Sequence, residues 1–237
     1  MTDTPAIETP ATAVRRMKHA GRRRPARRPP PLRDQAYDAI KQRIICCELR
    51  PGEVLSEALL SETLGFGRTP IHQAIARLAG EGLIEVMSRK GIMIRPESLD
   101  DILNIIEVRR LTESLTARCA AERAQAADIR AIEQNLDAMW RAARARDLGR
   151  LMTLDGEFHA LLALHSRNAV LTEILAMLRN RAARQWFISL RANEQHIRVC
   201  EQHAEIVDAV RRHDPDSAEI AMRRHIDAFL DNASKQI

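Results

Sequence analysis

Four side chains in the C-terminal half of the sequence have the types and spacing of a metal site. Asp155 and His159 are four residues apart, so on a helix they project from one face, one turn apart. His203 and His225 each lie among apolar residues at helical spacing. Neutral imidazoles and a carboxylate are ligands for Zn²⁺ or Ni²⁺, and also for Fe²⁺ or Mn²⁺. The pattern predicts a divalent metal ion bound inside a helical bundle.

Other interpretations of these residues stay open. Each histidine alone could be a core residue, whereas a buried Asp155 must be paired or bound to metal. Three imidazoles and one carboxylate also suit a metal-dependent enzyme, because they leave coordination positions open. An enzyme needs a general base beside the metal, and helical spacing turns the nearby Glu157 away from Asp155 and His159. We therefore favour a binding site and keep the metal-dependent enzyme as the alternative.

Long helices must position these four residues. From residue 98 to 237 the sequence has one proline and only two glycines, Gly149 and Gly156. Apolar periodicity predicts six helices there, near 99–125, 128–146, 148–165, 169–191, 194–212 and 215–234. Ser98, Asn168 and Asp214 are suitable N-terminal caps. Short connections between such helices predict an antiparallel, all-α bundle over residues 98–237.

Residues 34–97 have a different pattern. Helices are expected at 34–47, 57–64 and 69–80, the second capped by Ser56 and ended by Gly65. The first helix has one apolar face, consisting of Ala36, Tyr37, Ile40, Ile44 and Cys47. Two short β-rich runs, Leu83–Met87 and Ile92–Arg95, follow and are joined by a basic turn. This order is typical of a winged helix-turn-helix, so the chain is expected to be mainly α.

A winged helix-turn-helix places its recognition helix in the major groove of DNA. The candidate base-reading residues at the start of that helix are Arg68, Thr69, His72 and Gln73. Arg89 and Lys90 at the tip of the wing suit a phosphate or minor-groove contact. Thr69 has an alternative role as a helix cap. The pattern predicts double-stranded DNA as the partner.

The net charge of +5 is concentrated at the N-terminus. Residues 1–33 hold nine Lys or Arg against Asp3 and Glu8, which leaves the rest of the chain at −2. This Pro/Arg-rich tail is expected to be disordered, and either binds DNA phosphates or only aids solubility.

The sequence has few aromatic residues, no Gly-rich phosphate loop, no secretory signal and no apolar run near 18 residues. The four cysteines match no disulfide or zinc framework, and we expect buried thiols in a cytoplasmic protein without membrane contact.

The run RTPIHQAIARLAGEGLIEVMSRKGIMI resembles the operator-reading domain of the GntR superfamily, whose usual run is SRTPVREALxRLxxEGLVxxxxxRGxxV. The resemblance covers residues 34–97. It implies that Arg68 and Thr69 contact DNA and that Arg89 to Gly91 form the wing contacts.

The sequence departs from this pattern at several positions. Gly67 replaces a serine, which removes an expected N-cap oxygen. His72 and Ala58 replace groove-facing arginines, and Gln73 replaces a glutamate. We therefore expect an operator half-site different from that of well-studied relatives.

The segments DGEFH, EQHAEIVDAV and AMRRHI resemble the FCD effector domain of the FadR-like branch of that superfamily, of VanR-like size. Metal-binding members share a D-x₃-H…H…H arrangement, which implies these ligands: Asp155, His159, His203 and His225. Arg109 matches an arginine that faces the carboxylate of the effector, and its alternative role is a salt bridge to Glu113. The expected protein is a homodimeric regulator, a repressor, that binds a palindromic operator and responds to a small organic acid.

Overall fold

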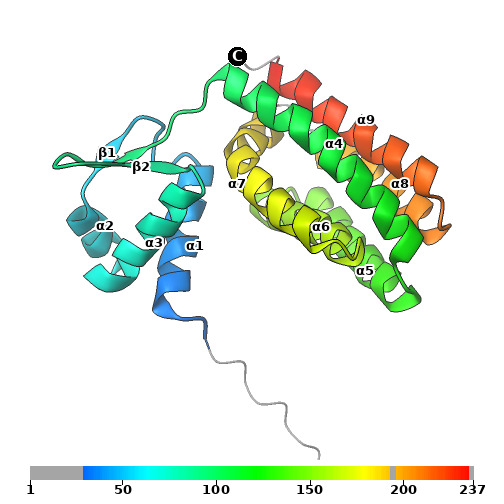
Figure 1. Cartoon of the computed structure of the whole chain (residues 1–237), viewed down its shortest axis with the longest axis horizontal. Coiled ribbons are helices and arrows are strands. Elements are labelled where there is room, and N and C mark those ends of the chain that lie inside the picture. Colours follow the sequence, from blue (N-terminus) through cyan, green and yellow to red (C-terminus); the bar gives the residue numbers. More distant parts are fainter. Residues whose placement is uncertain (1–28, 193–195, 235–237) are drawn as a thin grey trace, which may run out of the picture. The chain divides into compact units, whose positions relative to one another are not determined.

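The computed structural model describes residues 29–192 and 196–234 (Figure 1). The predicted Pro/Arg-rich tail falls almost entirely on residues 1–28, which lie outside the described residues. The fold is mainly α, as the periodicity predicts. No helix among the described residues is long and apolar enough to cross a membrane.

The N-terminal part contains three helices and a small sheet. In chain order these are α1 (Leu32–Ile45), β1 (Val54–Leu55), α2 (Glu57–Leu64), α3 (Arg68–Gly80), β2 (Ile84–Met87) and β3 (Gly91–Ile94). Ser56 caps α2 by accepting a hydrogen bond from the Leu59 amide, and Gly65 ends it in the left-handed conformation, as expected. The predicted winged helix-turn-helix is confirmed.

Three details of the N-terminal part differ from the prediction. α1 ends at Ile45, and half-buried Cys47 has a φ of 58°, so this residue is not on the apolar face of the helix; Ile45 is buried there instead. Cys46 is also half-buried, so the expectation of buried thiols holds only for Cys119 and Cys200. The short strand β1 has no apolar periodicity to reveal it, because it is two residues long.

The wing is an antiparallel sheet with the strand order β1-β3-β2. Gly91 begins β3 with a φ of 109°, and a Cβ atom there would lie 2.4 Å from the Leu55 carbonyl oxygen of β1. Only glycine permits that backbone conformation and that close approach. Gly91 therefore holds β1 against the wing.

The remaining described chain forms the predicted six helices (Figure 1): α4 (Leu99–Arg123), α5 (Ala126–Arg144), α6 (Leu148–His165), α7 (Ala169–Ala192), α8 (His196–Arg211) and α9 (Pro215–Ser234). Ser98 and Asp101 form a reciprocal capping box at the start of α4. Asn168 and Asp214 accept amide hydrogen bonds from Leu171 and Ser217, so both caps are confirmed. These caps begin the helices that carry the candidate site.

The bundle encloses one large apolar core drawn from α4, α5, α6, α8 and α9. Phe158, Ile132 and Met139 are completely buried in it. Burial of such side chains is the main stabilising contribution to a helical bundle. The polar residues of the candidate site are held inside this core.

Candidate functional site

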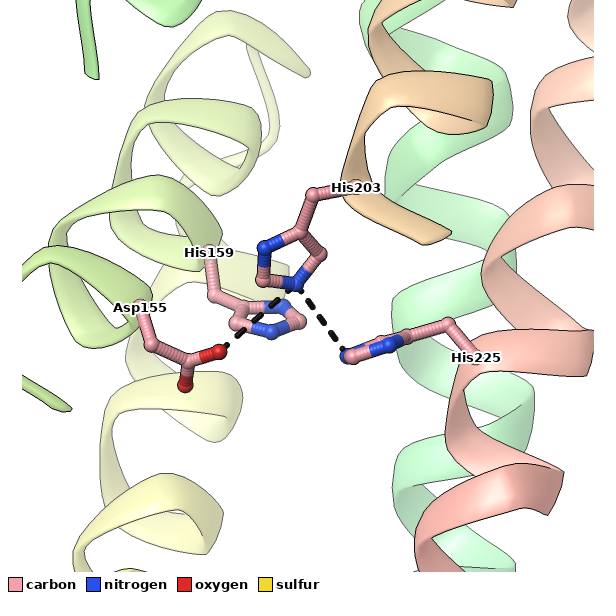
Figure 2. A group of neighbouring side chains, drawn as sticks. All are labelled: Asp155, His159, His203 and His225. Atoms are coloured by element: carbon pink, nitrogen blue, oxygen red, sulfur yellow. Dashed lines mark hydrogen bonds and ion pairs between the residues drawn. The ribbon is translucent and has the colours of Figure 1, made fainter. Parts of the chain in front are cut away.

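Four predicted ligands meet inside the bundle, as Figure 2 shows. Asp155 and His159 come from α6, His203 from α8 and His225 from α9. All four are buried, and one ligand atom from each lies within 4.8 Å of the others. Residues up to 70 positions apart in the sequence thus share one site.

Apolar packing orients the site. Phe158, which is fully buried next to His159 in the sequence, stacks on the His203 ring with centroids 4.2 Å apart. The residues of α6 that share the buried side with the two ligands are Leu151, Leu154, Phe158 and Leu162. The same amphipathic pattern that folds α6 into the bundle therefore places Asp155 and His159 in the interior.

The distances within the cluster suit a bound cation. His203 Nε2 lies 3.3 Å from His225 Nε2 and 3.6 Å from Asp155 Oδ1 (Figure 2). Two nitrogens bound at about 2.1 Å to one tetrahedral Zn²⁺ would be about 3.4 Å apart. Buried Asp155 Oδ1 has no hydrogen-bond partner among the described residues. An unpaired buried carboxylate oxygen is costly, and a metal ion would satisfy it.

Burial also favours the metal-binding state of the imidazoles. It lowers the pKa of His225 to about 3, and the neighbouring His159 adds to the shift. It lowers the pKa of His203 well below the usual value, and His225 and His159 contribute. Both rings are therefore neutral near pH 7, which is the form that binds metal.

A second layer of polar residues orients the histidines. Glu113 Oε2 of α4 lies 2.5 Å from His159 Nδ1, and Gln202 Oε1 accepts a 3.1 Å hydrogen bond from His225 Nδ1. Contacts of this kind direct the other ring nitrogen towards a metal. Periodicity did not assign Glu113 or Gln202 to the site. Only the packing of α4 against α6, and of α8 against α9, makes these contacts visible.

Arg109 forms one of the two contacts that the sequence left open, the salt bridge to Glu113. Its Nε donates to Glu113 Oε1 at 2.6 Å, so the predicted salt bridge forms. Burial would raise the pKa of Glu113, but Arg109 and His159 outweigh it and hold that pKa well below its usual range. Arg109 also lines the cavity that reaches the ligand cluster. The ion pair therefore presents a cation to that cavity.

The cavity has a volume of about 480 Å³, within the size range of small-molecule sites. Its wall includes three of the four candidate ligands, Asp155, His159 and His225, together with the two arginines Arg109 and Arg179. The apolar wall residues include Met152, Trp186 and Phe229. The lining also includes four residues of α1: Asp38, Lys41, Gln42 and Ile45. The site can take a small polar molecule next to the ligand cluster.

The predicted base-reading residues lie along one exposed edge of α3. Arg68, Thr69, His72 and Gln73 are exposed, whereas Ile71, Ile75 and Leu78 are buried against the domain core. Gly67 is the N-cap and supplies no side-chain oxygen, as expected. Thr69 lies inside the helix, so its alternative role as the cap is wrong. His72 Nδ1 is 3.2 Å from Glu57 Oε1.

The tip of the wing carries exposed basic residues. Arg89 and Lys90 project from the turn between β2 and β3, and the Lys90 amide donates to the Met87 carbonyl at 3.1 Å. Arg89 has a φ of 64°, which belongs to this tight turn. The turn thus holds two cations at the end of the hairpin, in the position expected of a wing.

Family comparisons agree with both parts of the fold. Residues 32–94 match the family model described as "Bacterial regulatory proteins, gntR family", and residues 104–228 match the FCD domain. The HTH-type transcriptional repressor RspR of Escherichia coli K12 is 27% identical, covering 83% of this chain and 86% of that protein. The repressor NanR of Enterobacter sp. strain 638 is 28% identical, covering 87% and 86%.

Solved structures have the same fold. E. coli McbR/YncC has a TM-score of 0.78 at 18% identity and covers 88% of this chain and 99% of its own. A putative GntR regulator from Rhodococcus sp. RHA1 has a TM-score of 0.70 at 21% identity, covering 84% and 96%. Proteins of this family regulate transcription and are not enzymes, so the metal-dependent enzyme is the wrong alternative. The chain belongs to the gntR family of bacterial regulatory proteins, in its FCD-domain form, and is a DNA-binding transcriptional regulator.

Proposed function

We propose that this regulator is a homodimeric repressor whose affinity for a palindromic operator is set by a small organic acid bound in the FCD bundle. The observation that carries the proposal is a cluster of four ligand atoms, three of whose residues line one cavity together with Arg109. A divalent cation beside a guanidinium group favours a carboxylate ligand. The named repressors among the relatives support repression as the direction of control.

The proposed metal ligands are Asp155, His159, His203 and His225. The unpaired Asp155 oxygen and the neutral imidazoles fit Zn²⁺ or Ni²⁺, with Fe²⁺ or Mn²⁺ as alternatives. A bound ion would supply positive charge and open coordination positions for a carboxylate. Arg109, fixed by Glu113, holds the acid in place from the cavity wall.

The proposed DNA contacts are Arg68, Thr69, His72 and Gln73 on α3, with Arg89, Lys90 and Gly91 in the wing. All of these except Gly91 are exposed, and the α3 residues share one edge of the recognition helix. A palindromic operator requires two copies of that helix.

Exposed apolar side chains on two contacting helices support the homodimer. On α4 these are Leu99, Leu103, Val108, Leu111 and Leu115, and on α7 they are Val170, Ile174 and Met177. Leu111 and Val170 are each 65% exposed in the single chain. An apolar surface of this kind is typical of a protein interface, and in a homodimer it is covered by the same surface of the partner.

The lining of the cavity supports a direct route from effector to DNA. α1 packs against the recognition helix α3 and also contributes four residues to the cavity wall. An acid that contacts α1 in one arrangement of the winged helices favours that arrangement over others. The ligand would thereby change the spacing or the rigidity of the two recognition helices.

Fluorescence anisotropy with the full chain tests this function. The operator is first selected from random duplex DNA, and affinity is then measured with and without Zn²⁺ and a panel of small organic acids. We expect at least one acid to change the operator affinity several-fold in the wild type but not in His203→Ala. The control is His213→Asn. His213 is a histidine outside the cluster, and asparagine tolerates the φ of 51° at that position. An unchanged affinity across the panel would contradict the proposal.

Sedimentation tests the homodimer separately. Leu111→Glu combined with Met177→Glu is expected to shift the wild-type dimer towards monomer, because charges would be buried in the interface. Leu164→Glu is the control, since Leu164 is 57% exposed but lies on α6. A double variant that stays dimeric would place the interface elsewhere.

A further inference from the structure

Arg179 on α7 is a second cation in the wall of the effector cavity. Its Nη1 is buried and has no hydrogen-bond partner among the described residues. Burial lowers the pKa of this guanidinium, although the carboxylates of Glu113 and Asp155 act in the opposite direction. A buried guanidinium nitrogen without a partner is costly unless a ligand completes its hydrogen bonds.

The two buried arginines of the bundle, Arg109 and Arg184, each have an acidic partner. Arg109 donates to Glu113 at 2.6 Å. Arg184, one turn or so beyond Arg179 on α7, donates to the Arg95 carbonyl at 2.8 Å and lies 3.1 Å from Glu97 Oε1. Within the described ranges, no carboxylate forms an ion pair with Arg179. Among the residues that the structure describes, Arg179 therefore differs from Arg109 and Arg184 in having no acidic partner.

The charges at the inner end of the cavity indicate what the missing partner is. Arg109 and Glu113 cancel, and so do Asp155 and Arg179, while imidazoles that bind a metal ion are neutral. A divalent ion would then leave two uncompensated positive charges. The remaining charged wall residues, Asp38, Lys41 and Glu157, are not buried, so water and salt screen them.

We propose that Arg179 binds a second acidic group of the effector, so that the effector is a dicarboxylate. This inference rests on the proposed function, in which the first carboxylate binds at the metal and Arg109. The second carboxylate accepts hydrogen bonds from Arg179, which is the strong, charge-assisted kind. Met152, Trp186 and Phe229 line the same cavity and contact the hydrocarbon between the two acidic groups.

Isothermal titration calorimetry of the Zn²⁺-loaded full chain tests this. The probes are succinate, glutarate and adipate, each compared with its monoamide, which keeps the length and removes one charge. We expect the best diacid to bind about 10- to 100-fold more tightly than its monoamide. In Arg179→Met that difference is expected to vanish while the affinity for the monoamide stays within about threefold, because the metal and Arg109 still bind the first carboxylate.

Arg181→Met is the matched control. Arg181 is on the same helix but is not in the cavity wall, so this variant is expected to keep the preference for diacids. Thermal denaturation of each variant identifies any loss of folding. If Arg179→Met fails to fold, Arg179→Lys replaces it. This variant keeps the charge and is expected to retain part of the preference for diacids over monoamides.

The possible failures are distinct. Diacids that bind no better than monoamides overturn this inference and leave the proposed function intact. Equal losses for both probes in Arg179→Met also overturn it, because Arg179 would then not recognise the second group. Inorganic phosphate that binds as tightly as the best diacid excludes a two-ended ligand. Absence of any Zn²⁺-dependent binding of an acid contradicts the proposed function itself.

Discussion

Glu113 Oε2 lies 2.5 Å from His159 Nδ1, while the other oxygen of the same carboxylate accepts a hydrogen bond from Arg109. One buried carboxylate on α4 thus contacts a candidate metal ligand and a candidate effector-binding cation. The contact with His159 orients that ring, and the hydrogen bond from Arg109 fixes the arginine at the cavity wall. Glu113 therefore connects the two halves of the proposed site.

Changing Glu113 to Gln is expected to weaken Zn²⁺ binding about 10- to 100-fold, because His159 loses the anion that orients its ring. The affinity is measured by competition with a chromophoric chelator. Glu122→Gln is the control, because Glu122 is on the same helix and half-exposed at the surface. Wild-type affinity in Glu113→Gln would show that this contact does not tune the metal site.

Acid is expected to destabilise the metal-free protein through its buried histidines. His225 has a pKa near 3 when folded against an ordinary value of 6.5, so the unfolded chain binds more protons between those pH values. The stabilising contribution is complete above pH 6.5 and falls as the pH drops towards 3. For His225 alone the loss between pH 7 and pH 5 is about 2 kcal/mol.

Urea denaturation at pH 7 and pH 5, with a chelator present, measures this loss. In His225→Gln the free energy of unfolding is expected to differ less between pH 7 and pH 5 than it does in the wild type. The comparison with this variant is needed because burial raises the pKa of Asp155, which acts in the opposite direction. If the free energy of unfolding depended on pH identically in the wild type and in His225→Gln, the assignment of this effect to His225 would be contradicted.

Arg68→Ala is expected to reduce affinity for the selected operator by about 1–3 kcal/mol, with little change for random DNA, because Arg68 is expected to read a base. Lys90→Ala is expected to weaken binding to both DNAs and to lower the salt slope by about one. Arg223→Ala, on the surface of α9, is the control for loss of charge. Equal losses on both DNAs in Arg68→Ala would make Arg68 a phosphate contact.

Gly91→Ala is expected to lower the free energy of unfolding by at least about 2 kcal/mol, because the new Cβ would meet the Leu55 carbonyl and the backbone would stay at a positive φ. Gly80→Ala is the matched control, since a Cβ at Gly80 would have no heavy atom within 4 Å. That change is expected to be neutral or to stabilise by about 0.5 kcal/mol. Thermal and urea denaturation measure the stability of the two variants. Similar free energies of unfolding for Gly91→Ala and Gly80→Ala would show that the wing tolerates a side chain at residue 91.

Local patterns in the sequence determined most of the fold. Apolar periodicity, capping residues such as Ser56 and Ser98, and glycines such as Gly65 specify helices through interactions within a few residues. The winged helix and the six bundle helices were therefore predictable. The buried faces that carry Asp155, His159, His203 and His225 follow from the same periodicity.

Tertiary structure alone decided how those faces meet. The contacts of Glu113 with His159, of Gln202 with His225 and of β1 with β3 join residues that local patterns do not relate, because they depend on how the elements pack. Arg179 is one of many arginines in the sequence, and only packing places it in the cavity wall with Nη1 buried and with no acidic partner among the described residues. Side-chain type and spacing determine which groups are available, whereas the three-dimensional fold determines which of them are left to bind a ligand.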